Sequence, residues 1–192
     1  MENYSGYIKD CITDSMKLKH SLLKRADEIE NIADEIIGCY KNGGKVLTFG
    51  NGGSAADSMH IAGELSGRFK LERKSLEAYS LASDPIKITA IANDYGFENI
   101  FSRPIEGCAK KGDVLIGIST SGKSLNVIKG FEKGREIGTY NISFTGEGGG
   151  ILKPLSDICL DIFSTDTPRI QEAHELVYHL ICDLVEKKLF RK

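Results

Sequence analysis

Two polar, glycine-containing segments of the 192-residue chain could hold an anion. Gly50–Ser54 (GNGGS) follows the apolar run KVLTF, and Gly117–Ser124 (GISTSGKS) overlaps the end of another apolar run. Backbone N–H groups where such loops turn into helices attract phosphate. The second segment fits the G-x-x-x-x-G-K-[ST] pattern of ATP-binding P-loops, and Gly50, Gly52 and Ala55 fit a loose dinucleotide-binding pattern. The two segments predict an anion site and leave its ligand open.

Three ligands compete for these loops. A dinucleotide would need an acidic residue roughly 20 positions on, at the end of the next strand, but Glu77 falls inside the run SLEAYS. A P-loop kinase would need a carboxylate on a neighbouring strand for magnesium, and Asp161 is the candidate. A compact phosphate monoester, such as a sugar phosphate, suits a cluster of hydroxyls. The second loop supplies four, on Ser119, Thr120, Ser121 and Ser124. We favour the sugar phosphate and keep the P-loop kinase as the alternative.

A histidine and a glutamate stand four positions apart, as His60 and Glu64, in a segment that we expect to be helical. This spacing places the two side chains roughly 40° apart around a helix, so both could reach one metal ion. A half-buried histidine beside a solvated glutamate would give the same pattern. The spacing alone does not choose between a metal site and a solvated helix face.

The elements that must position these residues alternate between short β-rich runs and helical stretches. Most of the runs carry consecutive apolar residues, which is typical of strands buried on both faces of a parallel sheet. They are Lys45–Phe49, Ser75–Ser80, Asp113–Ser119, Thr139–Thr145 and Asp157–Ile162. We therefore predict a doubly wound α/β fold with a five-stranded parallel sheet, whose ligand lies at the carboxyl ends of the strands.

Helix boundaries are also legible. Ser54 and Asp57 form an S-x-x-D capping box that would open a helix over Ala55–Gly67, and Thr167-Pro168 would cap a helix running to about Leu189. We expect the latter helix to pack through one apolar face and to carry His179 on the opposite side. That face comprises Ile170, Ala173, Val177, Leu180, Ile181 and Leu184.

The first 41 residues read as a long helix. Apolar residues between Tyr4 and Tyr40 recur by threes and fours, close to a heptad. We predict that residues 1–41 pack on the core and against copies of the chain in other subunits; a helix folded only over its own domain is the alternative.

Length and composition predict one soluble domain over residues 1–192. With 27 acidic and 25 basic residues the net charge is −2, without a basic cluster, so we expect no nucleic acid partner. The polar start and the lack of a long apolar run predict a cytoplasmic protein without membrane association. The five scattered cysteines read as reduced core or near-core thiols.

Four motifs occur in order: GNGGSAADSMHIAGEL, the ND pair at Asn93-Asp94, ISTSGKS and RIQEAHELVYH. Together they make nearly the whole chain resemble the sugar isomerase (SIS) domain family, whose fold is a flavodoxin-like three-layer sandwich. Within that family, the resemblance implies an isomerase that converts sedoheptulose 7-phosphate to D-glycero-D-manno-heptose 7-phosphate through a cis-enediol. The product would feed activated heptose synthesis for lipopolysaccharide core or capsule. The resemblance also implies a homotetramer. A non-catalytic SIS protein, which binds a sugar phosphate or a replication initiator, is the other alternative.

The resemblance assigns roles to individual residues. It implies one zinc ion per subunit, held by His60, Glu64, Gln171 and His179. Glu64 would be the catalytic base and His179 the second acid/base group.

Substrate contacts follow in the same way. The residues that would bind the sugar are Asn51, Gly52, Gly53, Glu64, Asn93, Asp94 and Gln171. The hydroxyls of Ser119, Thr120, Ser121 and Ser124 would hold the phosphate. We interpret Lys123 as an exposed helix-start lysine, Arg68 as either a substrate contact or a surface residue, and His174 as structural.

Overall fold

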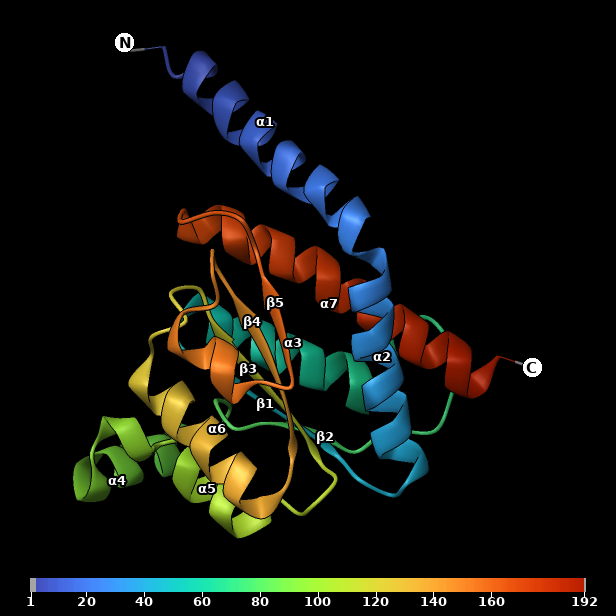
Figure 1. The fold of residues 1–192 in the computed structure, drawn as a ribbon, viewed down its shortest axis with the longest axis vertical. Coiled ribbons are helices and arrows are strands. Elements are labelled where there is room, and N and C mark those ends of the chain that lie inside the picture. The colour runs from blue at the N-terminus through green and yellow to red at the C-terminus, as the bar shows by residue number, and fades with distance from the viewer. Residues whose placement is uncertain (1–2, 192) are drawn as a thin grey trace.

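The predicted strands form one five-stranded parallel sheet in the computed structural model, which describes residues 3–191 (Figure 1). The strands are β1 (Val46–Gly50), β2 (Ala78–Ser80), β3 (Val114–Ser119), β4 (Tyr140–Thr145) and β5 (Ile158–Asp161). Their order is β2-β1-β3-β4-β5. This is the flavodoxin-like order, so the predicted doubly wound fold is confirmed.

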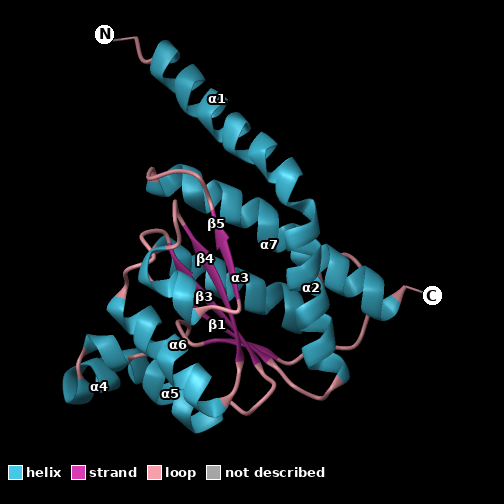
Figure 2. Cartoon of the chain, in the orientation of Figure 1, coloured by secondary structure: helices cyan, strands magenta, loops and turns pink. Residues whose placement is uncertain are grey.

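Helices cover both faces of the sheet (Figure 2). The α-helices are α1 (Ser5–Ser21), α2 (Ala26–Lys41), α3 (Gly53–Ser66), α4 (Pro85–Tyr95), α5 (Ser102–Cys108), α6 (Leu125–Ile137) and α7 (Thr167–Phe190). Three short 3-10 helices join them: η1 (Leu22–Arg25), η2 (Phe97–Asn99) and η3 (Gly150–Leu155). One apolar cluster packs α2, α3 and α7 against the sheet, and a second packs α5 and α6 against the opposite face. The chain is therefore a three-layer sandwich.

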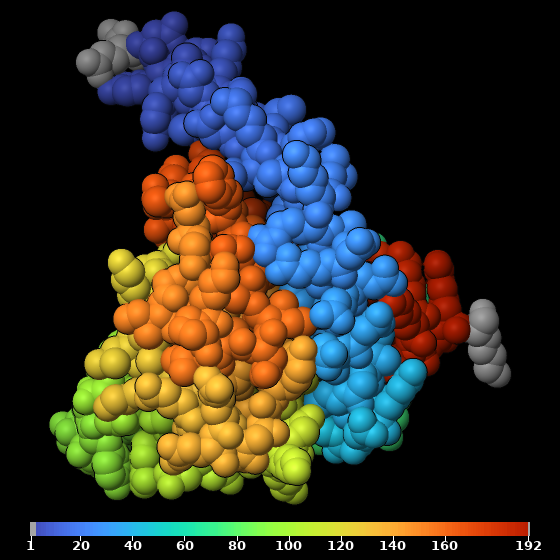
Figure 3. Space-filling model, viewed as in Figure 1, coloured from blue at the N-terminus to red at the C-terminus, as the bar shows by residue number. Residues whose placement is uncertain are grey.

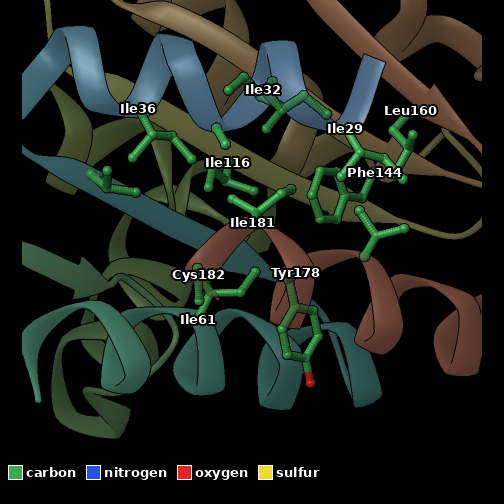
Figure 4. Packing of buried hydrophobic residues seen from close by; sticks show 14 of the residues in the cluster. Ile29, Ile32, Ile36, Ile61, Ile116, Phe144, Leu160, Tyr178, Ile181 and Cys182 are labelled. Carbon is green, nitrogen blue, oxygen red and sulfur yellow. The ribbon is translucent and has the colours of Figure 1, made fainter. Parts of the chain in front are cut away.

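The larger cluster fixes where α3 and α7 lie. Figure 4 shows Ile32 and Ile36 of α2 above the sheet residues Ile116 and Phe144, with Ile181 of α7 between them. Each of these side chains is at most 2% exposed. Burying an aliphatic or phenyl side chain contributes about 1.5–3 kcal/mol. This packing holds α7 beside α3.

The N-terminal segment is helical but not one continuous helix. The 3-10 helix η1 separates α1 from α2. Within α2, residues such as Ile32 and Ile36 are fully buried against the domain, whereas α1 has no buried residue. Figure 3 shows α1 extending beyond the rest of the molecule. The second half of the segment folds over its own domain, and the first half leaves Tyr7, Ile8, Ile12 and Met16 exposed.

Both predicted helix caps are wrong by one or two residues. Helix α3 begins at Gly53 behind Gly52, whose φ of 55° glycine adopts without strain. Ser54 is therefore inside the first turn, 4% exposed, and does not cap the helix. Likewise α7 begins at Thr167 with Asp166 in the cap position.

Two predictions of burial also fail. Leu180 was expected on the packed face of α7 but is 42% exposed. Cys108 is exposed rather than near the core, while the other four cysteines are buried or partly buried, and all five are free thiols. Among residues 3–191, none of the helices combines the length and hydropathy that a bilayer crossing requires.

Candidate active site

The first predicted loop joins the end of β1 to α3 and is braced from two sides. Asn51 and Asn126 exchange a pair of amide hydrogen bonds of 2.9 and 2.8 Å, which ties this loop to the start of α6. A Cβ atom at Gly53 would collide with the side-chain amide of Gln171. The absence of a side chain at Gly53 thus lets the Gln171 amide pack directly on the backbone there.

The second loop gathers hydroxyls at the start of α6. The Ser119 hydroxyl lies 2.9 Å from that of Ser124 and 3.4 Å from that of Ser121, and the Lys123 N–H donates to Ser121 Oγ. Ser124 is the N-cap residue of α6, but its side chain makes no capping bond. The positive end of the helix and these hydroxyls form an environment that favours a compact anion.

The two loops face each other across a cavity of about 370 Å³. In the sheet, Gly50 pairs with Ile118, so β1 and β3 end at the same edge. The two strands meet where the strand order reverses, which is where flavodoxin-like folds bind ligands. The lining residues are Asn51, Phe97, Glu98, Ser124, Leu125 and Asn126. The volume is at the small end of the range for ligand pockets, as a single sugar phosphate requires.

Three of the four predicted metal ligands come together between α3 and α7. Candidate ligand atoms of His60, Glu64 and His179 all lie within 4.8 Å of one another. His60 Nε2 is 3.0 Å from Glu64 Oε1, and the two imidazole centroids are 4.9 Å apart. The side chains of His60 and Glu64 are 41% and 22% exposed, so the cluster opens to solvent on one side. Two histidines and one carboxylate are a donor set of catalytic zinc sites, which keep a further position open.

The comparisons with known proteins agree over nearly the full chain. The SIS domain family model matches residues 12–146. The phosphoheptose isomerase of Helicobacter pylori (strain P12) is 48% identical over 184 residues, 96% of either chain. The chain belongs to the phosphoheptose isomerase family of SIS-domain proteins. The phosphoheptose isomerase of Clostridium acetobutylicum is likewise 48% identical over 188 residues, again 96% of either chain. A solved phosphoheptose isomerase from Francisella tularensis has a TM-score of 0.93 at 32% identity and covers 97% of this chain and 100% of its own.

Membership in the phosphoheptose isomerase family does not favour the P-loop and dinucleotide alternatives. The positions of their candidate acidic residues also disagree with these alternatives. Asp161, the candidate magnesium ligand of a P-loop enzyme, forms ion pairs with Arg25 at 3.2 Å and Lys153 at 3.5 Å. Glu77, the candidate ribose ligand, precedes the first residue of β2. It therefore lies at the opposite end of the strand from the loops.

The remaining predicted residues of the phosphoheptose isomerase motifs are spread over the molecule. Gln171 precedes His179 by eight residues on α7, or ~12 Å along a helix axis, and its amide lies against Gly53. The Gln171 amide therefore lies beside the first loop. Asn93 and Asp94 are exposed at the end of α4, where they share a 2.8 Å hydrogen bond.

Arg68 and Lys123 are exposed, and His174 is buried. Arg68 is 62% exposed and lies 4.0 Å from Glu72. Lys123 is exposed, as expected for a helix-start lysine, and Thr120 is partly buried in the second loop. His174 is completely buried, which agrees with a structural role.

The structure adds a buried support that the sequence did not reveal. Glu186 and Arg73 are paired at 3.0 Å, and each side chain is 1% exposed. The Glu186 carboxylate also accepts three backbone N–H groups from residues 69–71. The anchored segment stacks Phe69 on His179 with ring centroids 5.6 Å apart. Glu186 and Arg73 lie 113 residues apart, so no local pattern could have paired them.

Burial also perturbs one acid near the cluster. Burial raises the pKa of Asp57 to about 6, assisted by the negative charge of Glu175 and opposed by His60. Asp57 Oδ2 is buried without a hydrogen-bond partner among the described residues. The predicted capping role would have satisfied this oxygen, but the residue lies a turn inside α3.

Proposed function

We propose that the protein isomerises sedoheptulose 7-phosphate to D-glycero-D-manno-heptose 7-phosphate in the cytoplasm. The product would supply nucleotide-activated heptose for lipopolysaccharide core or capsule. The observation that carries this proposal is the convergence of His60, Glu64 and His179. The first of the two loops suited to a sugar phosphate leads directly into α3, the helix that carries His60 and Glu64. The relatives named phosphoheptose isomerase, 48% identical over 96% of the chain, support the heptose substrate.

The substrate would lie with its phosphate on the second loop. The hydroxyls of Ser119, Ser121 and Ser124, together with Thr120, would replace water around the phosphate oxygens. The sugar would extend along the cavity toward Asn51, with Gly52, Gly53 and Gln171 on the same side. Contacts from Asn93 and Asp94 to the sugar stay a prediction.

The chain's acid and base groups can perform the required proton transfers. Glu64 would accept the proton leaving C1 and return it to C2, which converts the 2-ketose into the aldose. His179 would give a proton to O2 as the enediol forms and take one from O1 as the aldehyde forms. After both steps Glu64 and His179 are back in their starting states, and the ketose and the aldose are at the same overall oxidation level, so no external reductant or oxidant is needed.

The donor set His60, Glu64 and His179 fits zinc, which we propose as the cofactor, one per subunit. When bound, zinc polarises substrate oxygens and stabilises the negative charge of an enediolate. Glu64 Oε1 contacts His60, so we assign the proton transfer to the second carboxylate oxygen. That Gln171 completes the ligand set stays a prediction, and its amide would have to leave Gly53 to do so.

We also propose that the protein assembles as a homotetramer through α1. Large apolar side chains of this helix are between 54% and 69% exposed, among them Tyr7, Ile8, Ile12 and Met16. Contiguous exposed apolar surface of this kind marks an interface. Size-exclusion chromatography with light scattering tests this assembly, and a monomer at micromolar concentration would exclude it.

A proton NMR time course of sedoheptulose 7-phosphate tests the reaction. With purified protein, zinc and no nucleotide, we expect anomeric signals of an aldose phosphate. Glu64→Gln should lose at least about 10³-fold in rate, because the base is removed while shape is kept. Glu72→Gln is the matched control, since Glu72 is 91% exposed. Absence of product with the wild-type protein would refute the proposed function.

A further inference from the structure

Tyr178 joins the core to the candidate metal cluster. Its ring is 2% exposed within the apolar cluster formed with α2 and α3. Figure 4 shows the hydroxyl oxygen at the far end of the ring, pointing away from the other labelled core residues. That oxygen lies 2.9 Å from His60 Nδ1. A side chain locked by packing thus presents one polar atom to one histidine nitrogen.

His60 is held through both ring nitrogens. Nε2 is 3.0 Å from Glu64 Oε1 and faces the cluster, while Nδ1 faces Tyr178. The His60 side chain is 41% exposed, so neighbouring packing alone leaves it room to rotate. A histidine that binds a metal through one nitrogen generally has its other nitrogen fixed by a hydrogen bond, which selects the tautomer and the ring orientation.

We propose that Tyr178 is a positioning residue that sets the orientation and tautomer of His60, so that Nε2 is presented to a zinc ion. This inference rests on the metal site of the proposed function. It assigns to Tyr178 no contact with substrate and no proton transfer in the reaction.

A hydroxyl suits this position because it can both donate and accept. With Nε2–H donating to Glu64, Nδ1 carries a lone pair and accepts from the Tyr178 O–H. When Nε2 instead gives its lone pair to a metal, neutral His60 carries its proton on Nδ1, which then donates to the Tyr178 oxygen. A carboxylate could only accept at this place. Tyr178 serves both states without moving.

Tyr178 keeps its hydroxyl proton. Burial raises the pKa of Tyr178 above its usual range, so the group stays neutral at physiological pH. The hydroxyl is therefore available both to donate to His60 Nδ1 and to accept from it.

Tyr178→Phe tests the inference, since it removes the hydroxyl and retains the buried ring. Tyr40→Phe is the matched control, because Tyr40 packs on the same cluster and its hydroxyl donates only to the Glu77 carbonyl, at 3.4 Å. Zinc affinity is measured on metal-free proteins by competition with a fluorescent chelator. We expect Tyr178→Phe to weaken zinc binding by about 10–100-fold and Tyr40→Phe by less than about 3-fold. A Tyr178→Phe affinity within about 3-fold of wild type would overturn the proposal.

A second readout reports the tautomer directly. In zinc-loaded wild-type protein, nitrogen-15 NMR of the histidines should show His60 bound through Nε2 with the proton on Nδ1. Tyr178→Phe should show loss or averaging of that pattern. His60 bound through Nδ1 in the wild type would overturn the assignment even if the affinities differ.

These outcomes separate this inference from the proposed function. If wild-type protein binds no zinc yet makes the aldose phosphate, the role of Tyr178 is refuted and the isomerase stands. If zinc binding depends on Tyr178 but no aldose phosphate forms, the positioning role stands and the substrate assignment fails.

Discussion

His174 should make the stability of the fold depend on pH in the acid range. Its side chain is 0% exposed on the face of α7 that packs against the sheet. Nε2 lies 3.1 Å from the Thr145 carbonyl oxygen, and Nδ1 is buried without a partner among the described residues. Burial lowers the pKa of His174 to about 4, and the hydrogen bond to Thr145 only partly offsets this. The folded protein therefore holds His174 neutral.

The lowered pKa of His174 sets the direction and the size of the change in folding stability with pH. An unfolded histidine titrates near 6.5, so between about 4 and 6.5 the unfolded chain binds the proton and the folded chain does not. The stabilising contribution is fully present above the unfolded pKa and is lost as pH falls. At 1.36 kcal/mol per pH unit, the loss approaches roughly 3 kcal/mol by pH 4.

Replacing His174 with glutamine isolates this effect. Glutamine retains an N–H donor for the Thr145 carbonyl but does not titrate. Urea unfolding at pH 7.5, 6.5, 5.5 and 4.5, with EDTA and a fixed protein concentration, gives the free energy of unfolding of each protein. At pH 7.5 the variant should be less stable by about 1–3 kcal/mol. Between pH 7.5 and 4.5 the difference should change by roughly 2.5 kcal/mol in favour of the variant, which then equals or exceeds the wild type in stability.

The control is His20→Gln, on an exposed residue of α1. Its free energy of unfolding should run parallel to that of the wild type at every pH. If the His174→Gln curve is also parallel to the wild type, His174 is not held neutral by burial and the reasoning fails.

Two further changes test the surroundings of the cluster. Asp57 should make the stability of the wild-type protein fall as pH rises, opposite to the effect of His174. Burial raises the pKa of Asp57 to about 6, so between about pH 4 and 6 the folded state binds more protons than the unfolded state. Asp57→Asn removes this effect. In metal-free protein we expect Asp57→Asn to raise the free energy of unfolding by about 1 kcal/mol at pH 7.5, a value already reduced for partial solvent exposure, and to leave it unchanged at pH 4. A lower free energy of unfolding at pH 7.5 would contradict this prediction. Glu186→Ala should cost about 3–5 kcal/mol in the free energy of unfolding, because Arg73 stays buried and unpaired. Amide hydrogen exchange at residues 69–71 should also be faster in this variant. If the free energy of unfolding falls by less than about 1 kcal/mol, the pair of Glu186 and Arg73 does not stabilise the fold.

Much of the fold could be predicted because it depends on local patterns. The runs that became β1 and β3 contain apolar residues at consecutive positions, which is typical of strands covered on both faces. His60 and Glu64 were predictable as a pair because one helical turn separates them. The two glycine-containing loops follow the strands directly, so their meeting at one edge of a parallel sheet also followed from the pattern.

Helix starts and the N-terminal segment were less predictable. Ser54 and Asp57 fit the sequence pattern of a capping box. However, Gly52 adopts a positive φ, α3 begins at Gly53, and Ser54 is buried in the first turn. The heptad-like spacing before Tyr40 continues through Leu22–Arg25, so it does not predict that η1 interrupts the helix there. Both outcomes depend on how the chain enters the packed layers, which short-range propensity does not specify.

The sequence by itself determined the sheet, its doubly wound class, the two glycine-containing loops at one edge and the pair on α3. Only the tertiary structure decided that His179 joins that pair, that Gln171 lies against Gly53, and that Tyr178 reaches His60. Local patterns repeat over a few residues and are set by helix and strand periodicity. The three long-range contacts depend instead on the rotation and offset of α7 against α3, which the packing of the shared core fixes.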